Sequence, residues 1–239
     1  MSTATKVVAI IQARMGSTRT PGKSFALVGG VPVVELVLRR LARSRRVDRV
    51  VLATSDLIRD KVLADHAEGA GFAAFRGPEN DLVARYHEAA RIHTATHVVR
   101  VCADNVFLDW TEIDRLVDYG LREGKDFVGF KNPTYPDRLN DFAGEFVTFA
   151  ALHRTFTETQ DPHDREHVFP YFYAHAETFK LGYLDVAEAL RTPVKLDLDY
   201  PDDLAILQEI GRRVADPVAV ASAEVVRLAN AIAAEKAAR

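Results

Sequence analysis

A glycine-containing segment rich in cations follows the first apolar run of the sequence. Between Ala13 and Lys23 stand two glycines, several hydroxyl side chains and the cations Arg14, Arg19 and Lys23. Glycine lets backbone N–H groups approach an anion closely, and cations neutralise the charge of that anion. The segment therefore predicts a binding site for phosphate groups.

The spacing in this segment differs from that of the common phosphate-binding motifs. Gly16 to Ser24 reads as a glycine, five residues and Gly-Lys-Ser, whereas a P-loop has four residues at that point and a helix that starts at the lysine. Residues 25–32 look like a second loop before any helix begins. The dinucleotide fingerprint GxGxxG is also absent. We expect an anion-binding loop of another kind.

Two carboxylates stand near the ends of later apolar runs. Asp104 follows the run His97 to Cys102, and Asp199 ends the run that starts near Val194. Mg²⁺ is commonly held by one or two carboxylates together with phosphate oxygens of a substrate. From the residues alone, a turn at Asp104 and a helix-flanking position for Asp199 are the simpler interpretations.

Short apolar runs alternate with helical patterns along the chain and would position these side chains. Val7 to Gln12, Arg49 to Ala53 and His97 to Cys102 are typical of strands covered on both faces of a parallel sheet. Apolar residues at helical spacing lie between them, as in Val33 to Leu41 and Leu82 to Ala90. The alternation predicts a doubly wound α/β fold with a mostly parallel sheet. Its ligand should lie beyond the carboxyl ends of the strands.

The second half of the chain is less regular. At residues 131–143 the pattern predicts a loop with proline and asparagine, and a strand-like stretch and two helical stretches follow. The run Val194 to Asp199 predicts a further strand, and Pro201 opens a helix. We expect residues 1–239 to form a single domain in which residues 131–185 are an inserted subdomain.

The composition excludes several classes of protein. The 239 residues include 31 Lys and Arg against 34 Asp and Glu, and the net charge of −3 argues against a dedicated nucleic-acid binder. The hydrophobic fraction of 48% is ordinary for a globular protein, and the apolar runs predict neither a membrane span nor a secretory signal. The single cysteine, Cys102, excludes an internal disulfide. A cytoplasmic location is the default expectation.

Six motifs occur in the order expected of one family. They are QARMGSTRTPGK (12–23), VLATSD (51–56), RVCADN (100–105), TYPD (134–137), DREHV (164–168) and LDYPDDL (198–204). With them, the chain resembles the cytidylyltransferase-like proteins of spore-coat polysaccharide biosynthesis, which are similar to the acylneuraminate and 3-deoxy-manno-octulosonate cytidylyltransferases. The resemblance extends to about residue 210. It implies a fold of the nucleotide-diphospho-sugar transferase type and transfer of CMP to a sugar.

The resemblance also assigns roles to particular residues. It implies Mg²⁺ held by Asp104 and Asp199, with Arg14, Lys23 and Asp104 as catalytic residues. It assigns nucleotide binding to Ala13, Arg14, Gly16, Ser17, Arg19, Lys23, Ser55, Asp81 and Arg85. It assigns acceptor binding to the inserted subdomain 131–185, through Tyr135, Asp137, Arg138, Glu145, Arg165, Glu166 and His167.

The chain departs from the family pattern at the base and at the acceptor. The octulosonate enzymes have a glutamine beside the base where this chain has Cys102, so CTP is the first expected nucleotide and GTP the alternative. Relatives often read TYPDGLDVEVF, whereas here Arg138 replaces the glycine and Ala143 stands at an acidic position. The acceptor need not be a standard nonulosonate, and Arg138 is suited to a carboxylate or a phosphate.

Two further signals have simpler interpretations. His163 to His167 matches the HxxEH spelling of an inverted zinc protease motif, but Pro162 places His163 in the first turn of its helix. We expect Arg165 and His167 to line the acceptor site instead. Cys102 lies in an apolar strand and is expected to be a buried small hydrophobe, not a nucleophile.

The hypothesis that these observations favour is a Mg²⁺-dependent cytidylyltransferase. It would transfer CMP from CTP to an acidic sugar such as a nonulosonate and release pyrophosphate. One alternative is a nucleotidyltransferase that uses GTP or a sugar-phosphate acceptor, and another is a catalytically silent nucleotide-sugar-binding protein. The apolar stripe of residues 218–232 favours core packing over a dimer contact, while the family resemblance implies a homodimer.

Overall fold

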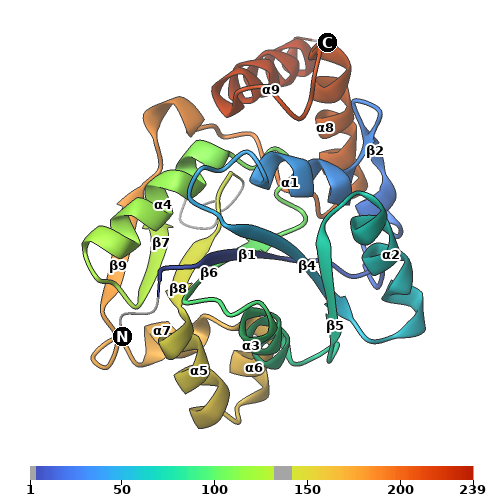
Figure 1. The fold of residues 1–239 in the computed structure, drawn as a ribbon. Helices are drawn as coiled ribbons and strands as arrows, with labels where there is room; N and C mark the ends of the chain where they lie inside the picture. The colour runs from blue at the N-terminus through green and yellow to red at the C-terminus, as the bar shows by residue number, and fades with distance from the viewer. Residues whose placement is uncertain (1–3, 132–141, 239) are drawn as a thin grey trace.

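One mixed sheet forms the centre of the molecule (Figure 1). The computed structural model describes residues 4–131 and 142–238. Within these residues the strand order of the sheet is β5-β4-β1-β6-β8-β7-β9, and β2 (Leu27–Val28) and β3 (Val31–Pro32) form a separate hairpin. The strands of the large sheet are β1 (Val7–Gln12), β4 (Arg49–Ser55), β5 (Ala73–Gly77), β6 (His97–Cys102), β7 (Phe127–Lys131), β8 (Glu145–Thr148) and β9 (Leu181–Asp185).

The apolar runs form the parallel part of the sheet, as predicted. β1 pairs in parallel with β4 on one side and with β6 on the other, and β4 pairs in parallel with β5. β8 runs antiparallel to β6 and β7, and β9 is parallel to β7. The chain builds outward from β1 to β5 and then returns to place β6 on the other side of β1. The carboxyl ends of β1 and β6 therefore meet at the point where a doubly wound sheet binds its ligand.

Helices cover both faces of the sheet. α1, α2 and α4 pack on one face, and α3, α5 and α7 pack on the other (Figure 1). The helices are α1 (Val33–Leu41), α2 (Lys61–Gly69), α3 (Leu82–Ile92), α4 (Trp110–Arg122), α5 (Phe149–Glu158), α6 (Pro162–His167), α7 (Pro170–Ala174), α8 (Pro201–Arg213) and α9 (Ser222–Ala237). The α/β fold and its mostly parallel sheet are confirmed.

The last two helices form an outer layer beside α1. α8 and α9 share a third apolar cluster with Val33 and Leu36 of α1 and with the segment after β6. Val225, Leu228 and Ile232 of the predicted stripe are buried in this cluster. The stripe therefore serves core packing, and the homodimer stays a prediction.

The segment before α8 corrects one expectation from the sequence. Residues 194–199 do not form the predicted strand. Leu196 and Leu198 are fully buried, which explains the alternating pattern, but they pack into the outer cluster. The Leu198 N–H donates to the carbonyl of Asp104 at 3.0 Å, so the segment lies along the loop after β6 and does not join the sheet.

The described part of residues 131–185 is continuous with the sheet. It contributes β8 between β6 and β7, and β9 at the edge. Its helices α5 and α7 pack into the same apolar cluster as α3. A role for this part of the chain as an acceptor-side subdomain stays a prediction.

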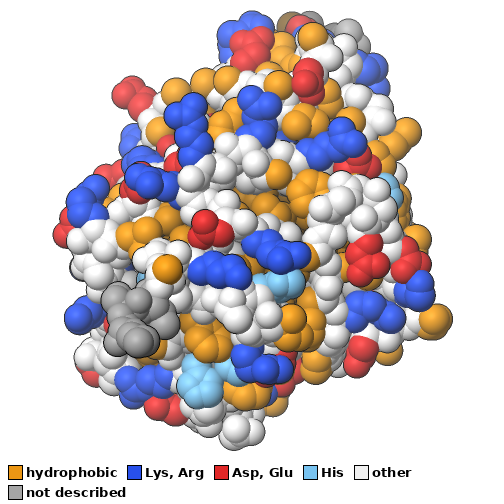
Figure 2. Space-filling view, viewed as in Figure 1, with side chains coloured by type: hydrophobic (Ala, Val, Ile, Leu, Met, Phe, Trp, Pro, Cys, Tyr) orange, Lys and Arg blue, Asp and Glu red, His pale blue; other side chains and the backbone are white. Residues whose placement is uncertain are grey.

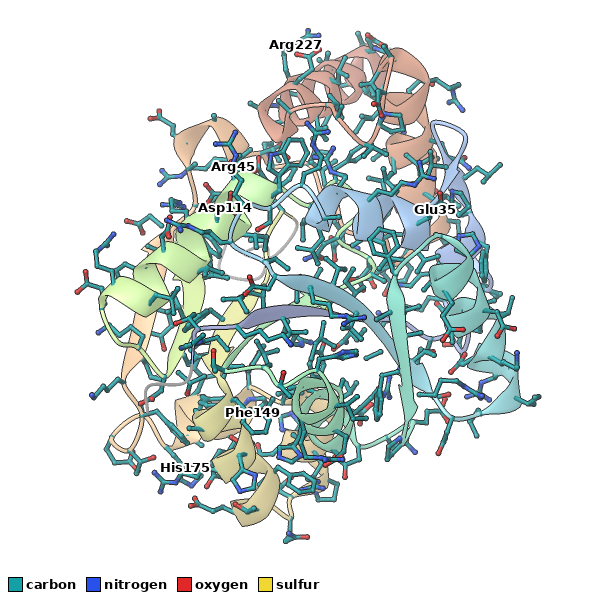
Figure 3. The ribbon with its side chains drawn as sticks, viewed as in Figure 1. Glu35, Arg45, Asp114, Phe149, His175 and Arg227 are labelled. Carbon is teal, nitrogen blue, oxygen red and sulfur yellow. The ribbon has the colours of Figure 1, made fainter. Side chains whose placement is uncertain are left out.

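Polar contacts hold the connections between these layers. Asp114 on α4 accepts the Ser44 hydroxyl at 2.5 Å and the Arg45 N–H at 2.9 Å, which fixes the turn after α1 (Figure 3). On the face shown in Figure 2, Lys and Arg side chains are interspersed with Asp and Glu. None of the helices in the described ranges combines the length and apolar character that crossing a bilayer requires.

Candidate functional site

The loop after β1 is anchored at its start by a buried carboxylate. The Ala13 N–H donates to the carbonyl of Ala53 at 3.3 Å, and the Met15 N–H donates to Asp60 Oδ1 at 2.7 Å. The other Asp60 oxygen accepts the hydroxyl of Ser55, and both residues are fully buried. Ser55, predicted at the nucleotide, lies behind the loop and acts on it through Asp60.

The sequence did not predict the role of Asp60 in holding the loop. Asp60 lies 45 residues from Met15, and no motif joins the two positions. The pairing of β1 with β4 brings them together, because Asp60 follows β4 at the same edge of the sheet. The sequence shows only an aspartate between a predicted strand and the following segment, and its burial is seen in the structure alone.

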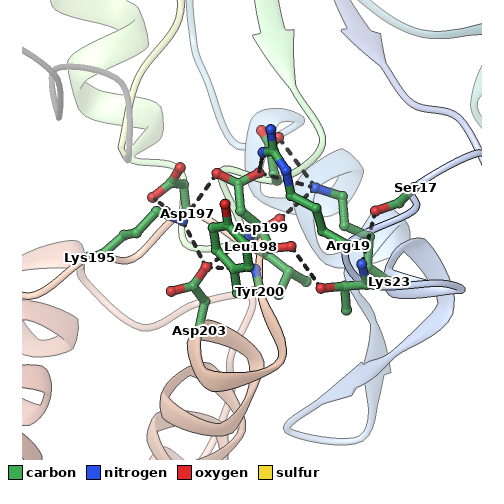
Figure 4. Close-up of polar contacts among 11 residues, drawn as sticks. Ser17, Arg19, Lys23, Lys195, Asp197, Leu198, Asp199, Tyr200 and Asp203 are labelled. Carbon is green, nitrogen blue, oxygen red and sulfur yellow. Dashed lines mark hydrogen bonds and ion pairs between the residues drawn. The ribbon is translucent and has the colours of Figure 1, made fainter.

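The end of the loop is tied to the segment before α8 (Figure 4). Thr20 Oγ1 donates to the carbonyl of Asp199 at 2.7 Å, and Lys23 Nζ donates to the carbonyl of Leu198 at 2.5 Å. Gly22 precedes Lys23 with φ of 74°, a left-handed conformation that favours glycine. These contacts fix the lysine beyond the ends of β1 and β6.

Asp104 and Asp199 converge on the ammonium group of this lysine. The Ala103 N–H donates to the carbonyl of Gln12 at 3.1 Å, which places Asp104 directly beyond the paired ends of β1 and β6. Lys23 Nζ lies 3.6 Å from Asp104 Oδ2 and 3.7 Å from Asp199 Oδ1. Lys23 thus lies within ion-pair distance of both carboxylates. The pair therefore suits a divalent cation that is also bound by phosphate oxygens.

A second lysine lies on the other side of Asp199. Its Oδ2 is 3.1 Å from Lys195 Nζ, which also donates to Asp203 Oδ2 at 2.7 Å. Asp203 in turn accepts the backbone N–H of Asp199 at 3.0 Å. Burial opposes ionisation of Asp199, but Lys195, Lys23 and Arg19 outweigh it and hold the pKa of this carboxyl below its usual value. The carboxylate is thus charged and oriented without a bound ligand.

A cavity of about 330 Å³ opens over these side chains. Its lining includes most of the predicted site residues: Ala13, Arg14, Gly16, Ser17, Arg19, Lys23, Arg85, Asp104, Glu166, His167 and Asp199. It also includes residues that were not predicted, among them Gln12, Thr18, Glu79, Leu82, Arg100 and Cys102. The structure therefore brings the phosphate loop, the carboxylate pair and the end of α6 to one cavity.

Arg85 places a positive charge in the wall of the cavity. It is 2% exposed, and its guanidinium donates to the carbonyls of Pro78 at 3.0 Å and Glu79 at 2.6 Å. Burial lowers the pKa of Arg85, but an arginine stays protonated in proteins. Its place in the cavity lining is consistent with the predicted contact to a nucleotide.

Asp81 and Arg165 bind each other outside the cavity lining. Asp81 caps α3 by accepting the Ala84 N–H at 2.8 Å, and its Oδ2 lies 2.5 Å from Arg165 Nη2. Arg165 Nη1 also donates to the carbonyls of Phe156 and Thr159. This pair joins α3 to α6 and so places the next two residues, Glu166 and His167, at the cavity.

Glu145 also lies behind the lining. It is 6% exposed, and its carboxylate oxygens lie 3.3 and 3.4 Å from Arg100 Nη1. Burial raises the pKa of Glu145, and the charge of Arg100 opposes that shift. Arg100 itself lines the cavity and was not predicted. Its signal in the sequence was a cation inside an otherwise apolar strand.

The remaining predicted residues are placed as follows. Tyr135, Asp137 and Arg138 lie outside the described residues. The expectation that Cys102 is buried in the core is wrong, because the residue lines the cavity and is only partly buried. The burial that remains raises the pKa of its thiol to about 12. A thiol with that pKa is protonated at neutral pH and is a poor nucleophile.

The structure also bears on the HxxEH motif. The rings of His163 and His167 lie 4.7 Å apart. No group of three or more His, Cys, Asp or Glu residues in the described ranges is placed to hold a metal ion. A cation at Asp104 and Asp199 would thus take its further ligands from a substrate or from water.

The chain is similar in sequence to known proteins over most of its length. The sequence profile of the cytidylyltransferase family matches residues 8–212. The chain belongs to the cytidylyltransferase family. The spore coat polysaccharide biosynthesis protein SpsF of Bacillus subtilis (strain 168) is 28% identical to this cytidylyltransferase over 231 residues, 94% of each chain.

Two solved structures share its fold. A cytidylyltransferase from Leptospira borgpetersenii superposes with a TM-score of 0.86 at 26% identity and covers 96% of both chains. A CMP:2-keto-3-deoxy-manno-octonic acid synthetase complexed with CTP superposes with a TM-score of 0.69 at 16% identity, over 87% of this chain and 99% of the other. The predicted family and nucleotide-diphospho-sugar transferase fold are confirmed, and the chain is a nucleotidyltransferase.

Proposed function

We propose that this cytidylyltransferase transfers CMP from CTP to a hydroxyl group of a sugar, with Mg²⁺ as the metal and pyrophosphate as the second product. The observation that carries the proposal is the position of Lys23 between Asp104 and Asp199 at the ends of β1 and β6. The relation to SpsF supports a sugar acceptor. The fold shared with a synthetase solved with CTP supports a cytidine nucleotide as donor.

The loop after β1 would bind the triphosphate. Arg14, Arg19 and Lys23 line the cavity and can neutralise a polyanion that reaches the carboxylate pair. The loop is held at both ends, by Asp60 at Met15 and by the carbonyl contacts of Thr20 and Lys23, so its donors are already positioned when the nucleotide arrives. Such preorganised charges are the main catalytic device in phosphoryl transfer.

Asp104 and Asp199 would hold the Mg²⁺ ion. When bound, the ion neutralises phosphate oxygens and stabilises the leaving pyrophosphate. Lys195 helps to keep Asp199 charged, and Asp203 holds the backbone of Asp199 in place for this role. Lys23 would then bind the phosphate groups beside the two carboxylates.

The transfer itself needs no covalent intermediate on the protein. The oxygen of a sugar hydroxyl would attack the α-phosphorus and give up its proton to the solvent, while the bond from that phosphorus to the bridging oxygen of the β-phosphate breaks and pyrophosphate leaves. Glu166 and His167 line the cavity and would position the acceptor. The predicted acceptor roles of Tyr135, Asp137, Arg138, Glu145 and Arg165 belong to this proposal, as do the homodimer and the cytoplasmic location.

Thermal unfolding with CTP, GTP, UTP and ATP, each with and without Mg²⁺, tests the proposal. A ligand at 100 times its Kd stabilises the native state by about 2.7 kcal/mol, which is a measurable rise in Tm. We expect the largest rise with CTP and Mg²⁺. We also expect Asp104→Asn to lose the Mg²⁺-dependent part of the rise and pyrophosphate release with sugar acceptors.

Asp118→Asn is the matched control, because that carboxylate lies on the surface of α4 and pairs with Arg46. It should behave as the wild type. A larger rise with GTP would reassign the base, and CTP binding without pyrophosphate release on any acceptor would favour a silent binding protein. An Asp104→Asn protein with full activity would refute the metal assignment.

A further inference from the structure

One cation in the cavity wall has hydrogen-bonding capacity to spare. Arg100 lies on β6 and faces the same side as Cys102, because residues two apart on a strand point the same way. Its side chain is 14% exposed and lines the cavity. Nε donates to Gln12 Oε1 at 3.2 Å, and Nη1 donates to Glu145 Oε2 at 3.3 Å. Nη2 makes no hydrogen bond to any residue in the described part of the chain.

The guanidinium is held in one position by three neighbours. Gln12 Oε1, which accepts from Arg100, also accepts the hydroxyl of Tyr86 at 3.0 Å and is therefore fixed itself. The ring of Phe169 lies 4.9 Å from the guanidinium carbon. A cation immobilised in this way loses little conformational freedom when it binds a ligand. Arg100 is built as a preorganised binding group.

The contacts between Arg100 and Glu145 are long. They measure 3.3 and 3.4 Å, whereas strong ion-paired hydrogen bonds of this type measure about 2.7–2.9 Å. Burial raises the pKa of Glu145 and the charge of Arg100 opposes that shift, while Glu145 in turn raises the pKa of Arg100. Nη2 is therefore available as a donor to a second anion that enters the cavity.

The neighbours of Arg100 indicate that it lies on the acceptor side of the cavity. Glu145 and Phe169 both come from residues 131–185, the predicted acceptor side. The cations suited to the triphosphate lie on the loop after β1. Arg165, the other cation predicted at the acceptor, is bound to Asp81 and to two carbonyls and does not line the cavity.

We propose that Arg100 binds the carboxylate of the sugar acceptor through its free nitrogen and makes the enzyme specific for acidic sugars. This inference rests on the proposed function, because it assigns an acceptor class to the same site. Gln12, Glu145 and Phe169 act as positioning residues that hold the guanidinium. The nucleotide does not depend on this contact.

Acceptor kinetics with matched acid and neutral sugars test the inference. The probes are 3-deoxy-manno-octulosonate, N-acetylneuraminate and their C1 amides, with CTP and Mg²⁺. We expect the wild type to prefer at least one acid over its amide by about 100-fold in kcat/KM, because the amide removes one charged hydrogen-bonded pair. Arg100→Met should lower kcat/KM for the acid to the level of the amide. It should leave the KM for CTP within about twofold of the wild type.

Two further variants separate binding from structure. Arg100→Lys keeps the charge and should retain part of the preference for the acid, and it serves if Arg100→Met does not fold. Arg154→Met, which removes an exposed cation on α5, is the control and should match the wild type. A preference that survives in Arg100→Met would overturn the inference.

Other outcomes would also contradict it. A rise in the KM for CTP in Arg100→Met would assign the residue to the nucleotide. A wild type that prefers the amides, neutral sugars or a sugar phosphate would refute the carboxylate assignment while the proposed function stands. A wild type that binds CTP in calorimetry but transfers CMP to no sugar would instead refute the proposed function.

Discussion

At the scale of single residues, Asp199 is held between two lysines that face different oxygens. Lys23 lies 3.7 Å from Oδ1 and Lys195 lies 3.1 Å from Oδ2. Oδ1 therefore faces the cavity, and Oδ2 is held by Lys195 within the segment that precedes α8. Asp203 completes this arrangement, because it binds Lys195 and the backbone of Asp199 together.

Replacement of Lys195 with Met should lower the free energy of unfolding by about 1 kcal/mol at pH 7 and by less at pH 3. Burial raises the pKa values of Asp199 and Asp203, but Lys195 and other neighbours outweigh burial and hold both values below their usual range. The stabilisation is therefore present above about pH 4 and is lost as the pH falls through the folded-state values. Urea unfolding of both proteins at the two pH values measures the difference.

Lys61→Met is the matched control, because its lysine pairs with Asp65 on the exposed surface of α2. It should change the free energy of unfolding by a few tenths of a kcal/mol at most. A loss in Lys195→Met that is as large at pH 3 as at pH 7 would show that packing of the lysine stem, and not its charge, carries the effect.

At the scale of elements, the position of α8 depends on a close contact between two glycines. A Cβ atom at Gly211 would lie 2.4 Å from the backbone nitrogen of Gly29 in the turn between β2 and β3. Gly29 has φ of 59°, which favours glycine as well. Because α8 begins directly after the segment that carries Asp199, this contact helps to set where the carboxylate pair forms.

Gly211→Ala should destabilise the protein by about 1–3 kcal/mol, since the added methyl group meets backbone atoms that have no room to move. This loss should exceed the helix propensity that alanine gains over glycine, about 1 kcal/mol. Thermal and urea unfolding measure the change. Gly69→Ala in α2 is the control, because nothing lies within 4 Å of its Cβ, and it should be neutral or slightly stabilising. Equal effects of the two changes would contradict the contact.

At the scale of the whole molecule, Arg40 on α1 joins the outer layer to the sheet. It is fully buried and donates to the carbonyls of Leu108 at 2.8 Å, Pro217 at 2.8 Å and Val220 at 2.9 Å. Burial lowers the pKa of Arg40 to about 10. Among the described residues it has no carboxylate within ion-pair distance, and the backbone carbonyls of two segments accept its hydrogen bonds. The loop after Asp104 and the connection between α8 and α9 are thus fastened at one point.

Arg40→Met should lower the free energy of unfolding by about 3 kcal/mol, because several buried carbonyls lose their donor together. The measurement is urea unfolding at neutral pH. Arg39→Met on the same helix removes an arginine that is 52% exposed and pairs with Glu35, and it should change stability by less than about 1 kcal/mol. If the two variants lost similar amounts, the carbonyl contacts of Arg40 would not be the fastening point.

The sequence by itself determined the features that depend on local backbone geometry and burial. The runs at β1 and β6 predicted their strands with the bounds that the structure has, and the stripe of α1 predicted a helix at Val33–Leu41. Lys23 was identifiable from the composition of its loop, whereas Asp104 and Asp199 were singled out only through the motifs of the family resemblance. Strand and helix periodicity follow from the repeat of the backbone, which is why a pattern of apolar residues suffices to predict them.

The tertiary structure alone decided which distant side chains meet. Asp60 supports Met15 only because β4 pairs with β1, and Arg100 has Glu145 beside it only because β8 enters the sheet antiparallel to β6. The apolar alternation of residues 194–199 predicted a strand, but the buried leucines pack against α8 and α9 and leave the backbone beside Asp104. An alternating pattern of apolar residues indicates which side chains are buried, but it does not indicate the element against which they pack.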